Sequence, residues 1–443
     1  MKILIVGNGG REHALAWTLR KDFRVKKIYI APGNGGTVFL RDIVQNIPIS
    51  VNDIKGLVAF ARQEHVDYVV VGPEFPLENG IVNAFRASNI SIIGPTKEAA
   101  KLETSKAFAK SVMTAAKIPT ACYKTFTNGF KAKDYVRSIK EFPIVIKASG
   151  IAAGKGVVIA YSLEDTEKAL KEMFEEKIFG NAGNEVIIEE FMRGEEASVF
   201  ALTDGIHYKL LSVAQDHKRI GEQDMGKNTG GMGAYAPTSI VNTNVLEQTK
   251  KSIIEPLLEE MTRRGTPFTG ILYIGLMIEN QIPKVVEFNA RLGDPETQVV
   301  LPLLETSLNS IFESMITSQI EGTNVLLSNN SAATVVLASS GYPDQYEIGH
   351  NIVSLNDASI WERYSEIKND VLVFHSGTKV ERNRLLTSGG RVLSVTGISE
   401  SLKKSLSLVY NKIKDVSFTN VYFRKDIGYR ELGRTGIKEG IKE

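Results

Sequence analysis

The sequence predicts an α/β protein with an N-terminal parallel sheet, a central region of mixed strands and helices, and a mostly β C-terminal part. Three observations predict this class. Apolar strand-like runs alternate with helical patterns through the first hundred residues, glycine-rich loops follow apolar runs between residues 143 and 237, and strand patterns return after residue 331. Such alternation is typical of parallel sheets covered by helices, whose ligands bind at the carboxyl ends of the strands.

Length, composition and charge limit the classes of protein to which this chain can belong. With 443 residues, 43% hydrophobic and 23% charged, the chain is expected to form about three domains. Its 53 basic residues nearly balance 51 acidic ones, which argues against a nucleic-acid partner. Cys122 is the only cysteine, so no intrachain disulfide can form and a cytoplasmic location is expected. No run resembles a membrane span or a signal peptide, so no membrane partner is expected.

The first hundred residues predict strands at 2–6, 27–30, 67–71 and 90–93, with helices at 12–21 and 54–64. The turn after the first strand could hold a phosphate monoester on open helix amides and a guanidinium; its residues are Asn8, Gly9, Gly10 and Arg11. A tight turn that requires glycine for packing is the alternative. A dinucleotide site is excluded because Glu12 replaces the third glycine of the fingerprint.

A lysine and a glycine-rich loop mark the next candidate site, after a helical stretch that contains Lys106. The predicted strand 143–148 carries Lys147, whose burial requires an anionic partner. The loop that follows offers mobile amides and a second cation, an arrangement that fits a polyphosphate; it contains Gly150, Gly154, Lys155 and Gly156. The spacing is not that of a Walker A loop. A flexible hairpin without a ligand is the alternative.

The stretch 186–203 predicts two strands joined by a polar turn. Apolar Phe191 and Met192 at this hinge fit an adenine between two lobes, and Glu196 is well placed for ribose hydroxyls. A solvated loop is the alternative. A second polar, glycine-rich segment at 215–237 begins with Asp216, His217, Lys218 and Arg219 and fits a phosphorylated substrate, with a plain surface loop as its alternative.

The stretch 285–298, VVEFNARLGDPETQ, is the clearest candidate site. After a predicted helix at 244–264, strands at 270–279 and 284–290 are expected to pair, which places Glu287 and Asn289 on one face. A carboxylate and an amide oxygen suit Mg²⁺, which takes few protein ligands and completes its shell with water and phosphate. Arg291 follows in a turn and adds a guanidinium. An ordinary strand with solvated polar residues is the alternative.

The order of these motifs along the chain resembles that of the ATP-grasp ligases. Their exact sequences resemble those of the glycinamide ribonucleotide synthetase family within that group. The matching phrases extend from Met1 to about residue 430: GNGGREHALAW at Gly7, APGNGGT at Ala31, VGPEFPL at Val71, GIAAGKG at Gly150, EEFMRGEEAS at Glu189, QDHKR at Gln215, NTGGMGAY at Asn228, RLGDPETQ at Arg291, SGYP at Ser340, HSGT at His375, GGRVL at Gly389 and RKDIG at Arg424.

This resemblance implies a fold and an activity. The fold would comprise a substrate-binding α/β domain at 1–102, a two-lobed ATP-grasp domain at 103–330 with a small mobile lobe at about 121–192, a β-rich domain at 331–430 and a charged tail at 431–443. The activity would be ligation of glycine to 5-phosphoribosylamine in de novo purine synthesis. ATP would be the co-substrate, glycyl phosphate the intermediate, and Mg²⁺ or Mn²⁺ the metal ion.

The resemblance also implies residue roles. Catalytic roles would fall to Arg291, Lys147, Asp216 and Lys218, and Glu287 and Asn289 would ligate the metal. The nucleotide would contact Lys106, Lys147, Gly150, Gly154, Lys155, Gly156, Glu189, Glu190, Met192 and Glu196, with Glu189 on the adenine amino group. The substrates would contact Asn8, Gly9, Gly10, Arg11, Asp216, Lys218, Asn228, Gly230, Arg291, Gly293 and Asp294.

Some positions depart from the family pattern. Ser149 stands where aspartate is usual, Leu292 where phenylalanine is usual, and Gly275 aligns with a metal-binding carboxylate of other ATP-grasp enzymes. The C-terminal part shows no cluster of acids, bases or ligands, so it is expected to be a lid or scaffold, with His375 structural. A single-function chain is expected, with a monomer as the simplest state.

Two rival functions are distinguishable by sequence. Another ATP-grasp carboxylate–amine ligase should lack the sequence motifs found here at 216–219 and 228–235. A non-catalytic nucleotide-binding regulator should have lost Lys147, Glu287 or Asn289, and all three are present.

Overall fold

The computed structural model describes residues 1–152, 156–354, 366 and 370–434. Its N-terminal part is a parallel five-stranded sheet, as predicted, with strand order β3-β2-β1-β4-β5. The strands are β1 (Lys2–Gly7), β2 (Lys27–Pro32), β3 (Val44–Asn46), β4 (Tyr68–Val71) and β5 (Ser91–Ile93). The helices are α1 (Gly10–Leu19), α2 (Ile54–Gln63), α3 (Glu74–Glu78) and α4 (Ile81–Arg86). The short strand β3 was not predicted, because its three residues include polar Gln45 and Asn46.

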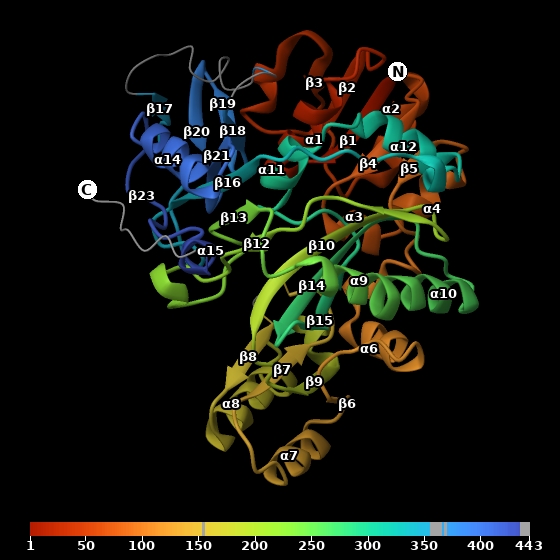
Figure 1. Ribbon diagram of the computed structural model, residues 1–443, viewed down its shortest axis with the longest axis vertical. Helices are drawn as coiled ribbons and strands as arrows, with labels where there is room; N and C mark the ends of the chain where they lie inside the picture. The colour runs from red at the N-terminus through yellow and green to blue at the C-terminus, as the bar shows by residue number, and fades with distance from the viewer. Residues whose placement is uncertain (153–155, 355–365, 367–369, 435–443) are drawn as a thin grey trace.

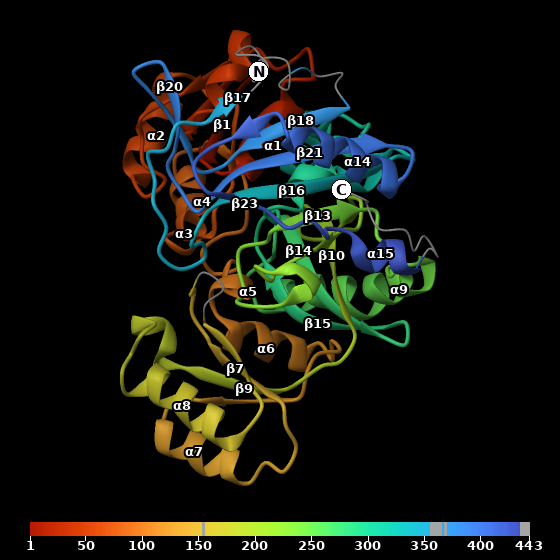
Figure 2. The same ribbon diagram turned by 90° about the vertical axis from the view of Figure 1, so that its left-hand side faces the viewer.

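A small antiparallel sheet forms a separate lobe at the end of the molecule away from the N-terminal sheet (Figures 1 and 2). Its strand order is β6-β9-β7-β8, and its helices are α7 (Gly129–Arg137) and α8 (Leu163–Phe174). The strands are β6 (Tyr123–Phe126), β7 (Ile144–Ala148), β8 (Val157–Ala160) and β9 (Val186–Glu190). A hydrophobic cluster of its own holds this lobe together, with Val136, Ile146, Leu170 and Ile188 at its centre. The hydrophobic core of this lobe is therefore separate from the main cores.

The larger central lobe is built on an antiparallel sheet of order β11-β10-β14-β15. Its strands are β10 (Glu195–Thr203), β11 (Tyr208–Leu210), β14 (Gly270–Glu279) and β15 (Ile282–Asn289). The expected pairing of β14 with β15 is confirmed. The helical segments are α5 (Lys101–Thr104), α6 (Lys106–Ala115), α9 (Thr243–Thr249), the π-helical turn η4 (Lys250–Ile254), α10 (Glu255–Arg263), α11 (Thr297–Val300) and α12 (Leu308–Ile316). The helix predicted at 244–264 thus exists, with one π-helical turn inside it.

The C-terminal part adds a sheet of order β12-β13-β16-β21-β18, with β23 on β16. Its strands are β12 (Gln215–Asp216), β13 (Gly233–Ala236), β16 (Ser331–Ser339), β18 (Val371–His375), β21 (Arg391–Ser399) and β23 (Val421–Tyr422). The remaining elements are the paired β17 (Val353–Ser354) and β22 (Val416–Ser417), the hairpin β19 (Thr378–Glu381) and β20 (Arg384–Thr387), and helices α14 (Leu402–Ile413) and α15 (Tyr429–Arg434). Strands β12 and β13 lie far earlier in the chain, so this sheet joins the glycine-rich segment at 215–237 to the C-terminal residues (Figure 1).

Among the described residues, no helix has the length and apolar character needed to cross a membrane.

Candidate active site

Several of the predicted site residues come from different elements and lie near the end of β15. Glu287 on β15 shows this convergence. Burial alone would raise the pKa of its carboxyl, yet nearby cations from separate elements hold that pKa below its usual range; they are Lys218, Lys147, Lys106 and Arg291. Four cations around one ionised carboxylate make a site for a strongly anionic ligand.

The two lysines expected to bind phosphates stand at the base of the small lobe. Lys106 begins α6, donates its backbone N–H to the Ser149 carbonyl at 2.9 Å and points Nζ at the Gly150 carbonyl, 3.3 Å away. Burial lowers the pKa of Lys106. Lys147 lies on β7, and β7 and β8 form an antiparallel hairpin whose tip is the glycine-rich loop. Gly156 lies at the end of that loop, whereas Gly154 and Lys155 lie outside the described residues.

The hinge between the lobes follows β9, which ends at Glu190. Glu190 Oε1 accepts the Cys122 N–H at 3.0 Å, which fastens the hinge to the start of β6. Phe191 is 37% exposed and Met192 half-buried. An apolar ring and a thioether that are partly exposed at a hinge fit a flat aromatic ligand, and adenine binding here stays a prediction.

Glu189 differs from its predicted role on an adenine amino group. It is 3% exposed, with Oε2 2.7 Å from Lys147 Nζ and Oε1 3.0 Å from Lys110 Nζ. Both carboxylate oxygens therefore face lysines. Lys110, which sequence reasoning missed, lies one helical turn beyond Lys106 on the same face of α6.

The predicted metal pair lies at the end of β15. Glu287 is ionised and partly exposed, and Gly275 lies directly opposite it on β14, so no second carboxylate stands at that position. Turned with its nitrogen toward Glu103, the Asn289 amide donates to that carboxylate at 3.0 Å and leaves its oxygen for a cation. Among the described residues, no group of three or more His, Cys, Asp or Glu is arranged as a metal site. The pair thus fits a hard cation that keeps most of its water.

Arg291 is held by carboxylates that the sequence analysis did not assign. Its Nη2 lies 2.9 Å from Glu103 Oε1, and its Nε lies 3.6 Å from Glu74 Oε2. Glu103 also accepts the Ala290 N–H at 2.7 Å, which fixes the end of β15. Burial raises the pKa of Glu103, although Arg291 opposes the shift. The motif VGPEFPL, which follows β4 and contains Glu74, was the one signal in the sequence that could have indicated the contact between Glu74 and Arg291.

Asp216, Lys218 and Glu196 form a charged group beside Glu287. Lys218 Nζ lies 2.5 Å from Glu196 Oε2 and 4.0 Å from Glu287 Oε1. Burial raises the pKa of Asp216 to about 7, although Lys218 opposes the shift. Burial favours neutral Lys218, but Glu196 and Asp216 hold its pKa well above the usual value. Glu196, expected on ribose hydroxyls, is thus also the counter-ion of Lys218.

The turn after β1 packs against the turn after β15. Arg11 is 7% exposed, with Nε 2.6 Å from Glu12 Oε1 and Nη1 donating to the Leu292 carbonyl at 3.1 Å. Glu12 also accepts the Gly9 N–H at 2.5 Å, and the Asn8 carbonyl accepts an amide N–H of Asn34 at 3.0 Å. A Cβ on Gly10 would lie only 2.5 Å from Gln298 Nε2. A larger residue at this position would therefore displace the ends of the Gln298 and Ser376 side chains.

The C-terminal part contributes a cation that holds two of the predicted substrate-binding segments together, and its expected role as a lid or scaffold stays a prediction. Arg391, at the start of β21, donates Nη1 to the carbonyls of Gly230 and Asp294 at 2.7 and 2.8 Å, and lies 3.2 Å from Asp294 Oδ1. It joins the glycine-rich segment to the turn after β15. Two other predicted residues belong to these segments: Asn228 forms an isolated β-bridge with Arg219, and Gly293 lies against the Glu296 carboxylate.

His375 is structural in the described contacts, as predicted. Its ring is 2% exposed and lies 3.2 Å from Thr378 Oγ1, and its N–H donates to His13 Nδ1 at 3.0 Å.

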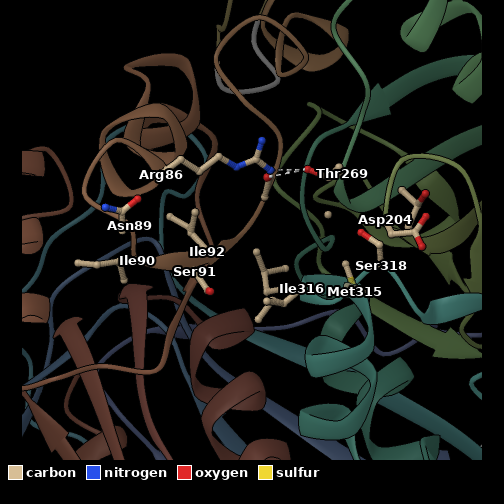
Figure 3. Close-up of a pocket in the computed structure, with 14 residues that line it drawn as sticks. Arg86, Asn89, Ile90, Ser91, Ile92, Asp204, Thr269, Met315, Ile316 and Ser318 are labelled. Carbon is tan, nitrogen blue, oxygen red and sulfur yellow. Dashed lines mark hydrogen bonds between the residues drawn. The ribbon is translucent and has the colours of Figure 1, made fainter.

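A cavity of about 470 Å³ lies away from these residues, at the free edge of β5 (Figure 3). In it Arg86 donates to Thr269 Oγ1 at 2.8 Å, with Ile92, Met315 and Asp204 also lining the space. It contains none of the predicted site residues.

Comparisons with known proteins show the family to which this chain belongs. The sequence matches the families described as phosphoribosylglycinamide synthetase N domain at residues 1–103, ATP-grasp (A) domain at 104–297 and C domain at 332–430. A phosphoribosylamine–glycine ligase from Chlorobaculum tepidum is 49% identical over 98% of this chain and 100% of its own length. The crystal structure of a phosphoribosylamine–glycine ligase from Thermotoga maritima superposes with a TM-score of 0.80 at 30% identity, covering 96% of this chain and 100% of that one.

The fold extends beyond these relatives. A biotin carboxylase from Campylobacter jejuni in complex with β,γ-ATP shares it, with a TM-score of 0.70 at 16% identity over 98% of this chain and 96% of that one.

Proposed function

Because the chain belongs to the phosphoribosylglycinamide synthetase family, we propose that it joins glycine to 5-phosphoribosylamine at the expense of ATP. The convergence of Lys106, Lys147 and Lys218 around Glu287 is the single observation that carries this proposal. It supplies cations for a triphosphate beside an ionised carboxylate that suits a divalent ion.

The reaction has two steps. A carboxylate oxygen of glycine attacks the γ-phosphorus of ATP, the bond to the β-phosphate oxygen breaks, and glycyl phosphate and ADP form. The amine of phosphoribosylamine then attacks the glycyl carbonyl, phosphate leaves with the electrons of the broken C–O bond, and the amine loses a proton. Such transfers depend on positioning and charge stabilisation, with little covalent chemistry for the protein.

The nucleotide would lie between the lobes. Lys106 and Lys147 neutralise its phosphates, the loop from Gly150 to Gly156 covers them, and adenine stacks near Met192 at the hinge. Glu190 and Glu196 flank the base and the ribose. Glu189 acts through Lys147, because both of its oxygens face lysines.

The other substrates would lie between the two packed turns. Arg291 stabilises the charge of the acyl phosphate, while the amides after β1 and the residues Lys218, Asn228, Gly230 and Asp294 surround phosphoribosylamine. Asp216 is a candidate to take the proton released in the second step, since burial raises its pKa to about 7. Arg11 and Arg391 shape this pocket by holding the turns together.

Glu287 and Asn289 would hold Mg²⁺ or Mn²⁺. When bound, the ion neutralises phosphate charge and orients the γ-phosphate. Membership of a purine-synthesis family supports action in the cytoplasm.

ADP release by the purified protein tests the proposal. With ATP and Mg²⁺, we expect release only when glycine and freshly generated 5-phosphoribosylamine are both present, with glycinamide ribonucleotide formed in equal amount. Release with glycine and another amine, but not with phosphoribosylamine, would overturn the substrate assignment.

A further inference from the structure

Lys110 on α6 is a buried cation without a place in the proposed reaction. Its side chain is 2% exposed, its Nζ lies 3.0 Å from Glu189 Oε1, and it donates to Thr120 Oγ1 at 2.8 Å. Burial lowers its pKa, and Glu189 opposes that shift. A lysine buried this deeply is costly unless its charge is compensated, so its contacts define its role.

Glu189 is shared between Lys110 and Lys147. Its second oxygen lies 2.7 Å from Lys147 Nζ, and the Lys147 side chain is 7% exposed. Two cations therefore face one carboxylate, and the group carries one net positive charge. Without Lys110, the whole charge of Glu189 would act on Lys147, and on any phosphate that approaches it.

Lys110 also connects the two lobes. Thr120, which accepts its hydrogen bond, donates in turn to the Val285 carbonyl at 2.7 Å, and Val285 lies two residues before Glu287 on β15. Glu189 lies on β9, which pairs with β7 so that Ile187 faces Lys147. A chain of polar contacts thus runs from the metal-binding strand of the large lobe to the phosphate-binding strand of the small lobe.

We propose that Lys110 is a positioning residue: it occupies one oxygen of Glu189 and so keeps Lys147 free to bind the nucleotide phosphates. The inference rests on the proposed function of Lys147 as a phosphate ligand. It assigns Lys110 no contact with substrate.

The test measures the affinity of the full-length protein for a non-hydrolysable ATP analogue with Mg²⁺, by titration calorimetry. We expect Lys110→Met to weaken binding by about tenfold or more, because the uncompensated Glu189 holds Lys147 and repels phosphate. Lys101→Met, at an exposed position on the preceding helix α5, is the matched control and should bind as the unaltered protein does.

The double variant Lys110→Met/Glu189→Gln separates positioning from plain structural support. Removing the carboxylate frees Lys147, so the double variant should bind the analogue at least about threefold better than Lys110→Met alone. A double variant that binds no better than Lys110→Met would overturn the proposal, as would unchanged affinity in Lys110→Met.

Thr120→Val serves if Lys110→Met does not fold. It removes the hydrogen bond to Lys110 and should weaken analogue binding by about two- to fivefold; no change would contradict the inference. This test measures binding without turnover, so its outcome is independent of the ligation assay. The role of Lys110 can be refuted while the unaltered protein still ligates glycine to phosphoribosylamine. Equally, the role of Lys110 can hold if the protein ligates other substrates.

Discussion

Replacing Glu287 with glutamine should weaken metal activation more than any other single change on β15. The side chain keeps its shape but loses the only negative charge of the expected metal pair. Lys218 Nζ lies 4.0 Å from Glu287 Oε1, and two unit charges at that separation interact by about 4 kcal/mol at an effective dielectric constant of ~20.

Both side chains are about one-third exposed, 31% for Lys218 and 35% for Glu287, so screening reduces this interaction. Halving it gives about 2 kcal/mol for each unit of cation charge near Glu287, which corresponds to about 30-fold in affinity. A divalent ion carries twice the charge of Lys218, so we expect the Mg²⁺ concentration at half-maximal activity to rise by about 30-fold or more.

The assay is ADP release at fixed ATP as free Mg²⁺ is varied above the ATP concentration. Glu279→Gln, an exposed change on the neighbouring strand of the same hairpin, is the control and should leave the midpoint unchanged. Thermal unfolding of both variants verifies that the fold is kept. A midpoint for Glu287→Gln within about threefold of the unaltered protein would refute the metal assignment.

Three further outcomes are expected. Lys147→Met should raise KM for ATP by about 100-fold, since a charge-assisted contact to phosphate is lost; a steady-state ATP titration that gives an unchanged KM would exclude this role. Gly10→Ala places a Cβ 2.5 Å from Gln298 Nε2. It should raise KM for phosphoribosylamine about tenfold and leave KM for ATP unchanged. Gly322→Ala is the control, because no atom lies within 4 Å of the Cβ added there. Burial lowers the pKa of His375 to about 3 in the folded protein. In the unfolded chain this imidazole takes up a proton below about pH 6.5, so the folded state loses stability as the pH falls below 6.5. His375→Gln should therefore lose about 2 kcal/mol less stability than the unaltered protein between pH 7 and 5, measured by urea unfolding; equal losses would contradict the assignment.

Patterns local to the sequence predicted most of the fold. The apolar spacing of residues 402–413 predicts a helix with these bounds, and α14 has them because Ser401 caps it and one face is buried. The pairing of β14 with β15 followed from two adjacent apolar runs around a short turn. Strand β3 could not be predicted in this way, because its position depends on pairing with β2 rather than on its own apolar character.

The residue types of the site were also predictable, but their counter-ions were not. Lys147, Glu287 and Arg291 stood out by their place at strand ends. Their partners come from distant elements, such as Glu189, which pairs with β7 through β9, and Glu103, which precedes α6. Tertiary packing brings these ion-pair partners together, so no regular spacing between them can be recognised in the sequence.

The sheet that combines β12 and β13 with β16, β21 and β18 has a consequence for shortened forms of this chain. A product ending at residue 330 would keep every predicted nucleotide and metal residue, yet β13 would lose the strand that pairs with Gly233–Ala236. The resulting bare edge would be open to other chains, and Arg391 would no longer close the turn at Asp294. Such a fragment should precipitate or pair with itself rather than act as a smaller ligase.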